Sequence, residues 1–179
     1  MKRVLFFLLM IVHLSACRQK DTKYSNLFDS PLLYAKTVKE LNNVVMQNNF
    51  PPIIASRNYA YASIAAYEVI VLGDDRFQSL AGQIKHLPTI PQQDLANVNF
   101  QYAAILAFCK AGEAVTFPEG SMTAYRAMLD SLVRASGMTA AMKDASIQLA
   151  DSVANHILRW SRKDNYAETR TAERYNITQ

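Results

Sequence analysis

The chain has 179 residues, of which 50% are hydrophobic and 19% are charged, and its formal net charge is +4. This composition excludes a disordered protein and provides enough residues for one domain with a hydrophobic core. Lys2 and Arg3 carry two of the positive charges, and no basic stripe follows them. The sequence therefore does not indicate a nucleic-acid-binding face.

The first seventeen residues have the pattern of an export signal. Lys2 and Arg3 precede an apolar run over residues 4–14, which is shorter than the roughly 20 residues of a membrane-spanning helix. The run ends in Leu-Ser-Ala-Cys, which resembles the lipobox of bacterial lipoproteins. We therefore predict a signal peptide over residues 1–16 and lipid on Cys17. The alternatives are an ordinary cleavable signal and a simple membrane-anchor helix.

Residues 17–30 are polar, with few large apolar side chains. This segment is predicted to be a flexible lipidated tether between a membrane and the folded domain. Anchoring through several acyl chains is stable where one chain is marginal. The expected location is the cell envelope, outside the cytoplasm, with a lipid membrane as the partner of acylated Cys17.

Residues 31–163 are predicted to form an all-α bundle of about five helices. The first helix, over 31–48, follows a start signal at Ser30 and Pro31 and repeats apolar residues every three or four positions. The second, over 52–72, is rich in Ala and Ser and apolar nearly all round, which predicts the central helix of the bundle.

Three more helices follow a loop over residues 74–94, which holds at most a short helix around Ser79. The third helix is predicted over 92–115. Thr116 and Glu119 fit a capping box for the fourth, and Gly137 is placed to end it. The fifth runs from Thr139 through Trp160. The apolar periodicity stops after Arg162, and residues 164–179 are predicted to form a disordered or extended polar tail.

Arg57, Tyr61 and Glu68 are polar positions on the otherwise apolar second helix. We predict them to be buried structural residues. Arg57 and Glu68 share one helical face but lie about 16 Å apart, too far to pair with each other. Each is expected to have its own partner, on another helix or in a segment outside this chain. If the chain is part of a larger fold, this face should be incompletely covered, with an exposed apolar patch beside it.

Motifs of known chemistry are absent from the sequence. It has no P-loop, no G-x-S-x-G elbow and no G-x-G-x-x-G. His86 and His156 have no second ligand at metal-binding spacing, and His156 is expected near the edge of the core. Cys109 lies on an apolar stripe and is expected to be a small core residue. No catalytic residue and no metal site are predicted.

Three segments carry a resemblance to a known family. These are PPIIASRNYAYASIAAYE at 51–68, FQSLAGQ at 77–83 and HILRWSRKDNY at 156–166. They resemble bacterial vanadium-dependent haloperoxidase-like lipoproteins of the type 2 phosphatidic acid phosphatase superfamily. The resemblance extends from about residue 29 onward. It implies an all-helical fold that encloses a vanadate or phosphate site.

The resemblance implies that the residues of the oxyanion site come from three motifs in the later half of the family's sequences. These motifs are Lys-x6-Arg-Pro, Pro-Ser-Gly-His and Ser-Arg-x5-His. Lys163 and Arg170 match the first spacing, but Thr171 replaces the proline, and the other two motifs are absent. No catalytic residue and no cofactor are therefore carried over to this chain, and enzymatic activity stays open.

The chain resembles the non-catalytic N-terminal part of such an enzyme, expected to be inactive alone and to be completed by a missing C-terminal catalytic half. One alternative is a free-standing envelope lipoprotein acting as a helical binding or interaction module. Another is a small phosphatase or peroxidase with a site of a different kind.

Overall fold

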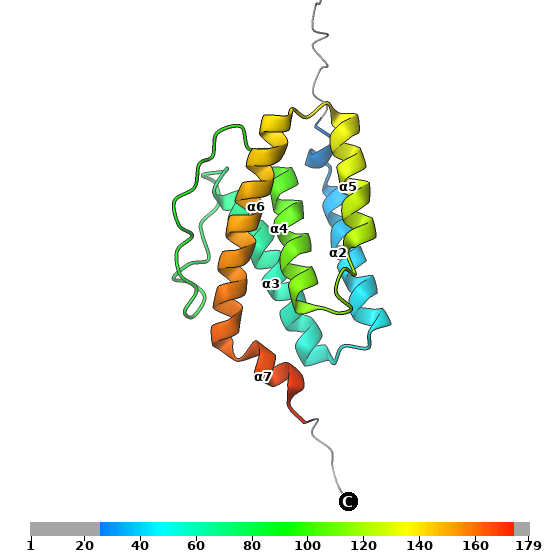
Figure 1. Ribbon diagram of the computed structural model, residues 1–179. Helices are drawn as coiled ribbons and strands as arrows, with labels where there is room; N and C mark the ends of the chain where they lie inside the picture. Colours follow the sequence, from blue (N-terminus) through cyan, green and yellow to red (C-terminus); the bar gives the residue numbers. More distant parts are fainter. Residues whose placement is uncertain (1–25, 174–179) are drawn as a thin grey trace, which may run out of the picture.

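The structure is a computed structural model that describes residues 26–173. The predicted signal peptide, Cys17 and the end of the polar tail lie outside these residues. The described chain is helical and contains no named strand, which confirms the predicted fold class (Figure 1). The elements are η1 (Leu27–Asp29), α2 (Pro31–Gln47), α3 (Pro52–Val71), α4 (Phe100–Val115), α5 (Thr123–Ser136), α6 (Ala140–Ser161), η2 (Arg162–Asp164) and α7 (Tyr166–Thr171).

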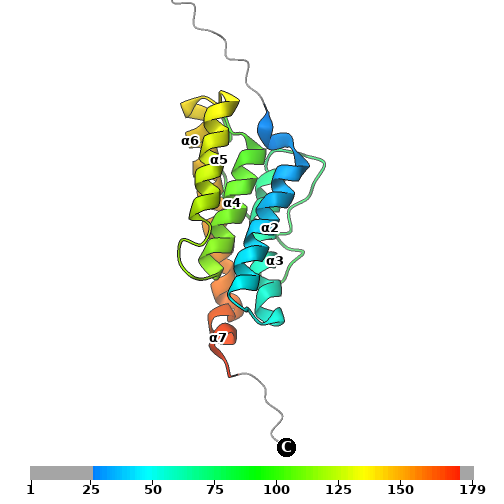
Figure 2. The ribbon, with the colours of Figure 1, turned by 90° about the vertical axis from the view of Figure 1, so that its right-hand side faces the viewer.

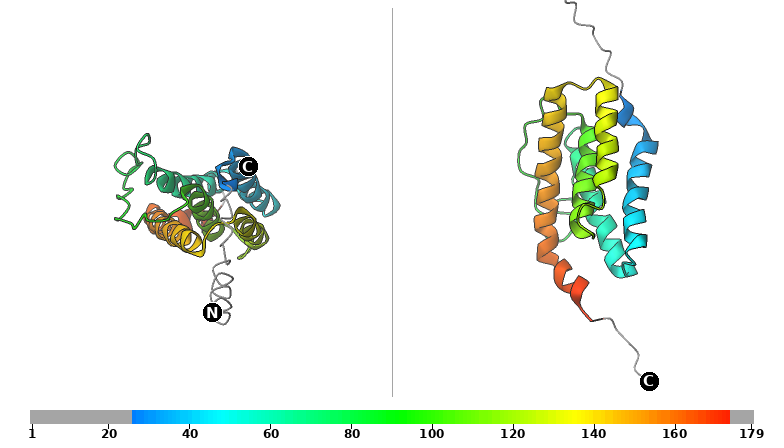
Figure 3. Two further views of the ribbon diagram at one scale, coloured as in Figure 1. Left: turned by 90° about the horizontal axis from the view of Figure 1, so that it is seen from above. Right: turned by 45° about the vertical axis from the view of Figure 1, so that its right-hand side comes forward.

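The central helix of the bundle is α4, with α2, α3, α5 and α6 around it (Figures 2 and 3). The prediction that residues 52–72 form the central helix was wrong. Small side chains do let α3 pack closely on α4 and α6, but Ile53, Ser56 and Ser63 on its other sides are exposed. The small residues of α3 therefore correctly indicate close packing on one side of the helix, but they do not indicate that all its sides are buried.

The core has two parts, one on each side of α4. The larger part joins α3, α4 and α6 and contains the buried alanines of all three helices. The smaller part joins η1, α2, α4 and α5. Cys109 is fully buried in the smaller part, and burial raises the pKa of its thiol to about 12. Cys109 is thus a core residue, as predicted.

Close contact between α2 and α4 depends on Gly112. A Cβ atom at this position would lie 3.0 Å from both terminal carbons of Leu41. Leu41 is fully buried, so its side chain has little room to move away. The glycine therefore sets how closely α2 can approach α4.

Two helix starts differ from the predictions. α4 begins at Phe100 instead of residue 92, because the Asn99 side chain accepts a hydrogen bond from Tyr102 N at 2.7 Å and caps the helix there. Thr116 does not cap α5. Its hydroxyl donates to Gly112 O at 2.9 Å at the end of α4, and α5 begins only at Thr123.

Other helix ends are confirmed. Gly137 ends α5 in the left-handed conformation, with φ at 74°. Thr139 caps α6 by accepting a hydrogen bond from Met142 N at 3.2 Å. Within residues 26–173, no helix is both long and apolar enough to cross a membrane.

The connection from α3 to α4 is a long ordered loop that lies beside α6 (Figure 1). It has no helix around Ser79, where a short one was considered. Trp160 Nε1 donates to Lys85 O at 3.3 Å, and His156 Nε2 lies 3.0 Å from Pro88 O. Leu87, a residue of this loop, is buried in the larger part of the core. These contacts hold the loop against α6 and place His156 at the edge of the core, as predicted.

Candidate functional site

The first residues of the predicted tail are folded. Residues 166–171 form α7, and Tyr166 is only 6% exposed. The expectation of an extended or disordered segment from Asp164 was therefore wrong for these residues. Asn165 takes the left-handed conformation, with φ at 61°, which turns the chain after η2 and brings Tyr166 back onto α3.

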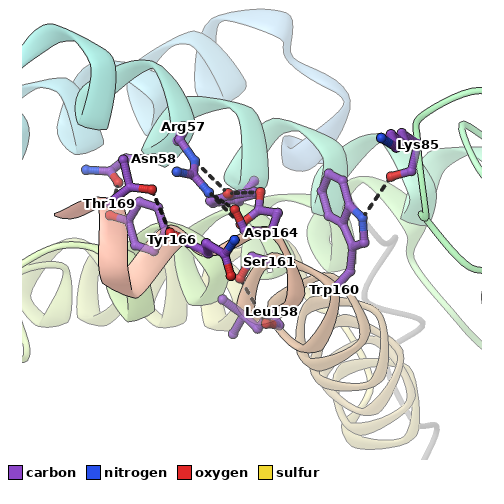
Figure 4. Close-up of polar contacts among 11 residues, drawn as sticks. Arg57, Asn58, Lys85, Leu158, Trp160, Ser161, Asp164, Tyr166 and Thr169 are labelled. Atoms are coloured by element: carbon purple, nitrogen blue, oxygen red, sulfur yellow. Dashed lines mark hydrogen bonds and ion pairs between the residues drawn. The ribbon is translucent and has the colours of Figure 1, made fainter. Parts of the chain in front are cut away.

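Arg57, Asn58, Tyr61, Asp164 and Tyr166 form a polar group between α3 and the start of α7, which we call the α3–α7 cluster. Figure 4 shows four of these side chains, those of Arg57, Asn58, Asp164 and Tyr166. Arg57 Nε donates to Tyr61 Oη at 2.9 Å. Its Nη2 donates to Asp164 Oδ1 at 2.5 Å and to Asp164 O at 3.0 Å. Tyr61 Oη donates to the second oxygen of the Asp164 carboxylate. Arg57 and Tyr61 therefore both bind Asp164.

Aromatic rings surround this polar group. The rings of Trp160 and Tyr166 meet the Tyr61 ring edge to face, with centroids 5.7 and 5.4 Å away. The Arg57 guanidinium lies 5.0 Å from the centre of the Tyr166 ring. Burial raises the pKa of Tyr61, and its hydrogen bond to Asp164 raises it further. Tyr61 is thus kept in the protonated form that donates to Asp164.

Tyr166 links α3 to the end of α4. Its hydroxyl lies 2.8 Å from Val115 O and also contacts the Asn58 side-chain oxygen. One hydroxyl has one proton and cannot donate to both, and Asn58 Nδ2 is left without a partner. Turning the Asn58 amide lets Nδ2 donate to Tyr166 while Tyr166 donates to Val115. In that arrangement, neither bond competes for the same proton.

Glu68, at the other end of α3, binds the long loop. Its side chain is 1% exposed and accepts hydrogen bonds from Ser79 Oγ at 2.8 Å and Leu80 N at 2.7 Å. Arg57 and Glu68 thus have separate partners, and both partners belong to the described chain. Tyr61, on the face between them, is 2% exposed. This face of α3 is thus buried at Tyr61 and Glu68, whereas Arg57 is partly exposed and Ile53, one turn before it, is 72% exposed.

The α3–α7 cluster does not fit a vanadate or phosphate group. An oxyanion site needs several cations that converge without a competing acid. Arg57 is bound to the Asp164 carboxylate, and the Arg170 guanidinium lies 5.3 Å from the Phe117 ring centre. Residues 26–173 also contain no group of three side chains able to hold a metal ion.

The geometry supports a structural prediction for Arg57. Arg57→Ala should lower the free energy of unfolding by about 1–2 kcal/mol, because Tyr61 and Asp164 lose a shared donor in a half-buried setting. Lys110→Ala is the control, since it breaks the more exposed pair with Asp151 and should cost roughly 0.5 kcal/mol or less. Urea denaturation measures the unfolding free energy of both variants. Equal losses would contradict the prediction that the α3–α7 cluster stabilises the fold more than an exposed ion pair does.

Neither a protein-family model nor a curated protein matches the chain. Among solved structures, the chain is similar to the crystal structure of the first bacterial vanadium-dependent iodoperoxidase. The TM-score is 0.73 and the identity 31% over 80% of the chain. The fold is haloperoxidase-like. This chain spans 35% of the iodoperoxidase chain, so the likeness concerns a related helical domain within a longer protein.

The haloperoxidase-like domain brings together residues that the sequence only partly indicated. Arg57, Tyr61 and Glu68 stood out as polar positions on an apolar helix. Tyr61 joins Arg57 in the α3–α7 cluster, whereas Glu68 lies apart at the loop. Asp164 and Tyr166 were missed as partners. The available signal was Tyr166 itself, an aromatic residue within a polar segment.

Proposed function

We propose that the chain is an exported protein, anchored to a membrane by lipid on Cys17, and that it forms the non-catalytic N-terminal part of a vanadium-dependent haloperoxidase or acid phosphatase-like enzyme. The observation that carries the proposed enzyme part is the iodoperoxidase likeness, which covers 80% of this chain and 35% of that chain. The proposed anchor rests on the Leu-Ser-Ala-Cys sequence that ends at Cys17. The proposed role is that of a helical scaffold for a C-terminal catalytic half.

The donors within the described chain support inactivity of this part alone. Catalysis on an oxyanion requires preorganised cations and hydrogen-bond donors around the group that gains charge. Arg57 and Tyr61 already serve the Asp164 carboxylate. In the proposed role, the bonds from Arg57 and Tyr61 to Asp164 hold the segment after α6 against α3. They thereby fix the direction in which the chain continues toward the catalytic half.

Activity measurements test the proposed inactivity. The purified chain should not oxidise iodide with hydrogen peroxide and added orthovanadate, and should not hydrolyse p-nitrophenyl phosphate. The bacterial iodoperoxidase serves as the positive control for iodide oxidation. A turnover rate that saturates with vanadate, or a phosphatase rate that follows the chain through purification, would overturn this part of the proposal.

The reading frame after the codon for Gln179 tests the link to a catalytic half. Under this proposal, the DNA continues in frame and encodes a Pro-Ser-Gly-His motif. Sequencing that region gives the answer directly. A stop codon with no such motif nearby would instead favour the second candidate below.

Cys17 gives a test of the anchor. Cys17→Ser should abolish incorporation of labelled palmitate. The protein should then either leave the membrane fraction for the soluble fraction or accumulate as the uncleaved precursor. Cys109→Ala is the matched control, because Cys109 is buried in the core and should leave the lipid label unchanged. Equal labelling of the wild-type and Cys17→Ser proteins would contradict lipid attachment at this cysteine.

A second candidate function is a free-standing envelope lipoprotein that acts as a helical interaction module. The polar contacts of α3 favour it, because Arg57 and Glu68 both bind partners inside the described chain. Under this candidate, the chain folds without any other polypeptide. Thermal denaturation of the purified chain should then show one cooperative unfolding transition.

A further inference from the structure

A cavity lies at the end of the bundle away from α7, and we call it the aromatic cavity. Its volume is about 320 Å³. The walls come from η1, the start of α2, the last turns of α3, the first turns of α4 and one residue of the long loop (Figure 2). Small-molecule pockets in proteins measure roughly 300–1,000 Å³, so the cavity is large enough to hold a small ligand.

Aromatic rings form much of the wall, and other contacts hold them in place. The aromatic lining residues are Phe28, Tyr34, Tyr67 and Phe77. Phe28 packs on Tyr102, with ring centroids 4.8 Å apart, and Tyr67 meets Phe77 edge to face at 6.2 Å. The Tyr67 hydroxyl donates to Gln78 O at 2.9 Å. The rings are therefore fixed before any ligand enters, which reduces the entropy lost on binding.

The interior of the aromatic cavity is apolar, and its mouth is polar. Ala66, Ala104 and Ile105 line it and are 2%, 3% and 1% exposed. Ser30 and Gln101 also line it, and both are exposed. A ligand can therefore place an apolar body among the rings while a polar end stays in water.

The charges near the aromatic cavity disfavour an anionic ligand. Asp29 is the one charged side chain among the described residues that line it. Arg76, beside Phe77, is bound to the Asp74 carboxylate at 2.6 Å. An anion would therefore lose hydration without gaining a free cationic partner. Asp29 is exposed and accepts a hydrogen bond from Asn26, so it adds little attraction for a cation in water.

We propose that the aromatic cavity binds an uncharged aromatic compound of two rings. An apolar cavity of about 150 Å³ holds one benzene molecule, and the aromatic cavity has about twice that volume. Fixed aromatic walls favour a flat ring over a hydrocarbon chain, because stacked and edge-to-face ring pairs gain energy beyond burial. This inference does not depend on lipid attachment or on a catalytic half.

Titration of the full chain with 2-naphthol tests the proposal, and 2-naphthoate is the anionic probe with the same rings. Isothermal titration calorimetry at neutral pH should show saturable binding of 2-naphthol. Binding of 2-naphthoate should be about ten-fold or more weaker, because its carboxylate has no free cationic partner. Equal affinity for the two probes, or no saturable binding of 2-naphthol, would overturn the proposal.

Two phenylalanines of nearly equal exposure give a matched pair of variants. Phe77 lines the aromatic cavity and is 42% exposed, whereas Phe117 follows α4 at the other end of the bundle and is 41% exposed. Phe77→Ala should weaken 2-naphthol binding by about five-fold, and Phe117→Ala should leave it unchanged. Equal weakening by both variants would overturn the proposal, because the probe would then bind exposed rings in general.

Gln101→Lys tests the charge preference at the mouth. The new cation should strengthen 2-naphthoate binding about three-fold or more and leave 2-naphthol binding unchanged. Gln101 is exposed, so the replacement should not disturb the fold. An unchanged affinity for 2-naphthoate would contradict its placement in the aromatic cavity and with it the proposed site.

Discussion

Glu68→Ala should lower the free energy of unfolding by about 2–4 kcal/mol, one of the two largest effects expected in this chain. The Glu68 side chain is buried and accepts hydrogen bonds from Ser79 Oγ and Leu80 N. Removing it leaves both donors without their acceptor and opens space beside α3. Urea denaturation of the wild-type and Glu68→Ala proteins measures the loss.

Glu40→Ala is the matched control for Glu68→Ala. Glu40 also lies within a helix, but it is only half-buried and makes one long hydrogen bond, from Asn43 Nδ2 at 3.4 Å. Its replacement should change the free energy of unfolding by about 0.5 kcal/mol or less. Similar losses for both variants would contradict a specific role of the buried Glu68 carboxylate, because Ala is the best helix former and neither replacement loses stability through helix propensity.

Hydrogen exchange gives a local test of the same contact. The Leu80 amide donates to Glu68 Oε1, so its exchange rate should rise in Glu68→Ala. Glu68→Gln should give a smaller increase, because its side-chain oxygen can still accept one hydrogen bond. An unchanged Leu80 exchange rate in Glu68→Ala would contradict the proposed anchoring of the loop.

The helix boundaries that the sequence predicted well are those with strong local signals. Pro31 and Pro52 each lie in the first turn of a helix, and the predicted ends of α2 and α3 are one residue beyond the observed ends. Gly137 and Thr139 likewise define the end of α5 and the start of α6. Proline, glycine and capping residues act over a few positions, so a sequence pattern suffices to find them.

The boundaries that were predicted wrongly depend on a choice between two local options. Leu95 and Val98 continue the apolar spacing of α4, but the Asn99 side chain caps the helix after them. Thr116 could cap the helix that follows it or bind the carbonyls of the helix before it, and it does the second. The pattern alone does not rank these options, because tertiary packing decides between them.

The candidate site was predictable in part for a related reason. Arg57 and Glu68 are unusual on an apolar helix, so their need for partners was visible in the sequence. Their partners were not, because Asp164 lies 107 residues from Arg57 and contacts it only after α6 has packed on α3. The reversal at Asn165 depends on one left-handed residue in a polar segment, which gives no periodic signal.

Tyr166→Ala should lower the free energy of unfolding by about 3 kcal/mol, because it removes a buried ring and two hydrogen bonds. Tyr166→Phe keeps the ring and should cost about 1–2 kcal/mol, since Val115 O and the Asn58 amide lose their partner. The difference between the two variants, measured by urea denaturation, gives the contribution of the buried Tyr166 ring, which packs on Tyr61 and lies beside the Arg57 guanidinium.

Tyr59 provides the control for Tyr166, because it lies on the same helix as Asn58 and its hydroxyl donates to Asn42 at 2.9 Å in an exposed setting. Tyr59→Phe should change stability by about 0.5 kcal/mol or less. Tyr166→Ala should also increase proteolysis within residues 164–173, because α7 then loses its one buried side chain. If cleavage there stays as slow as in the wild-type protein, Tyr166 is not what holds α7 on α3.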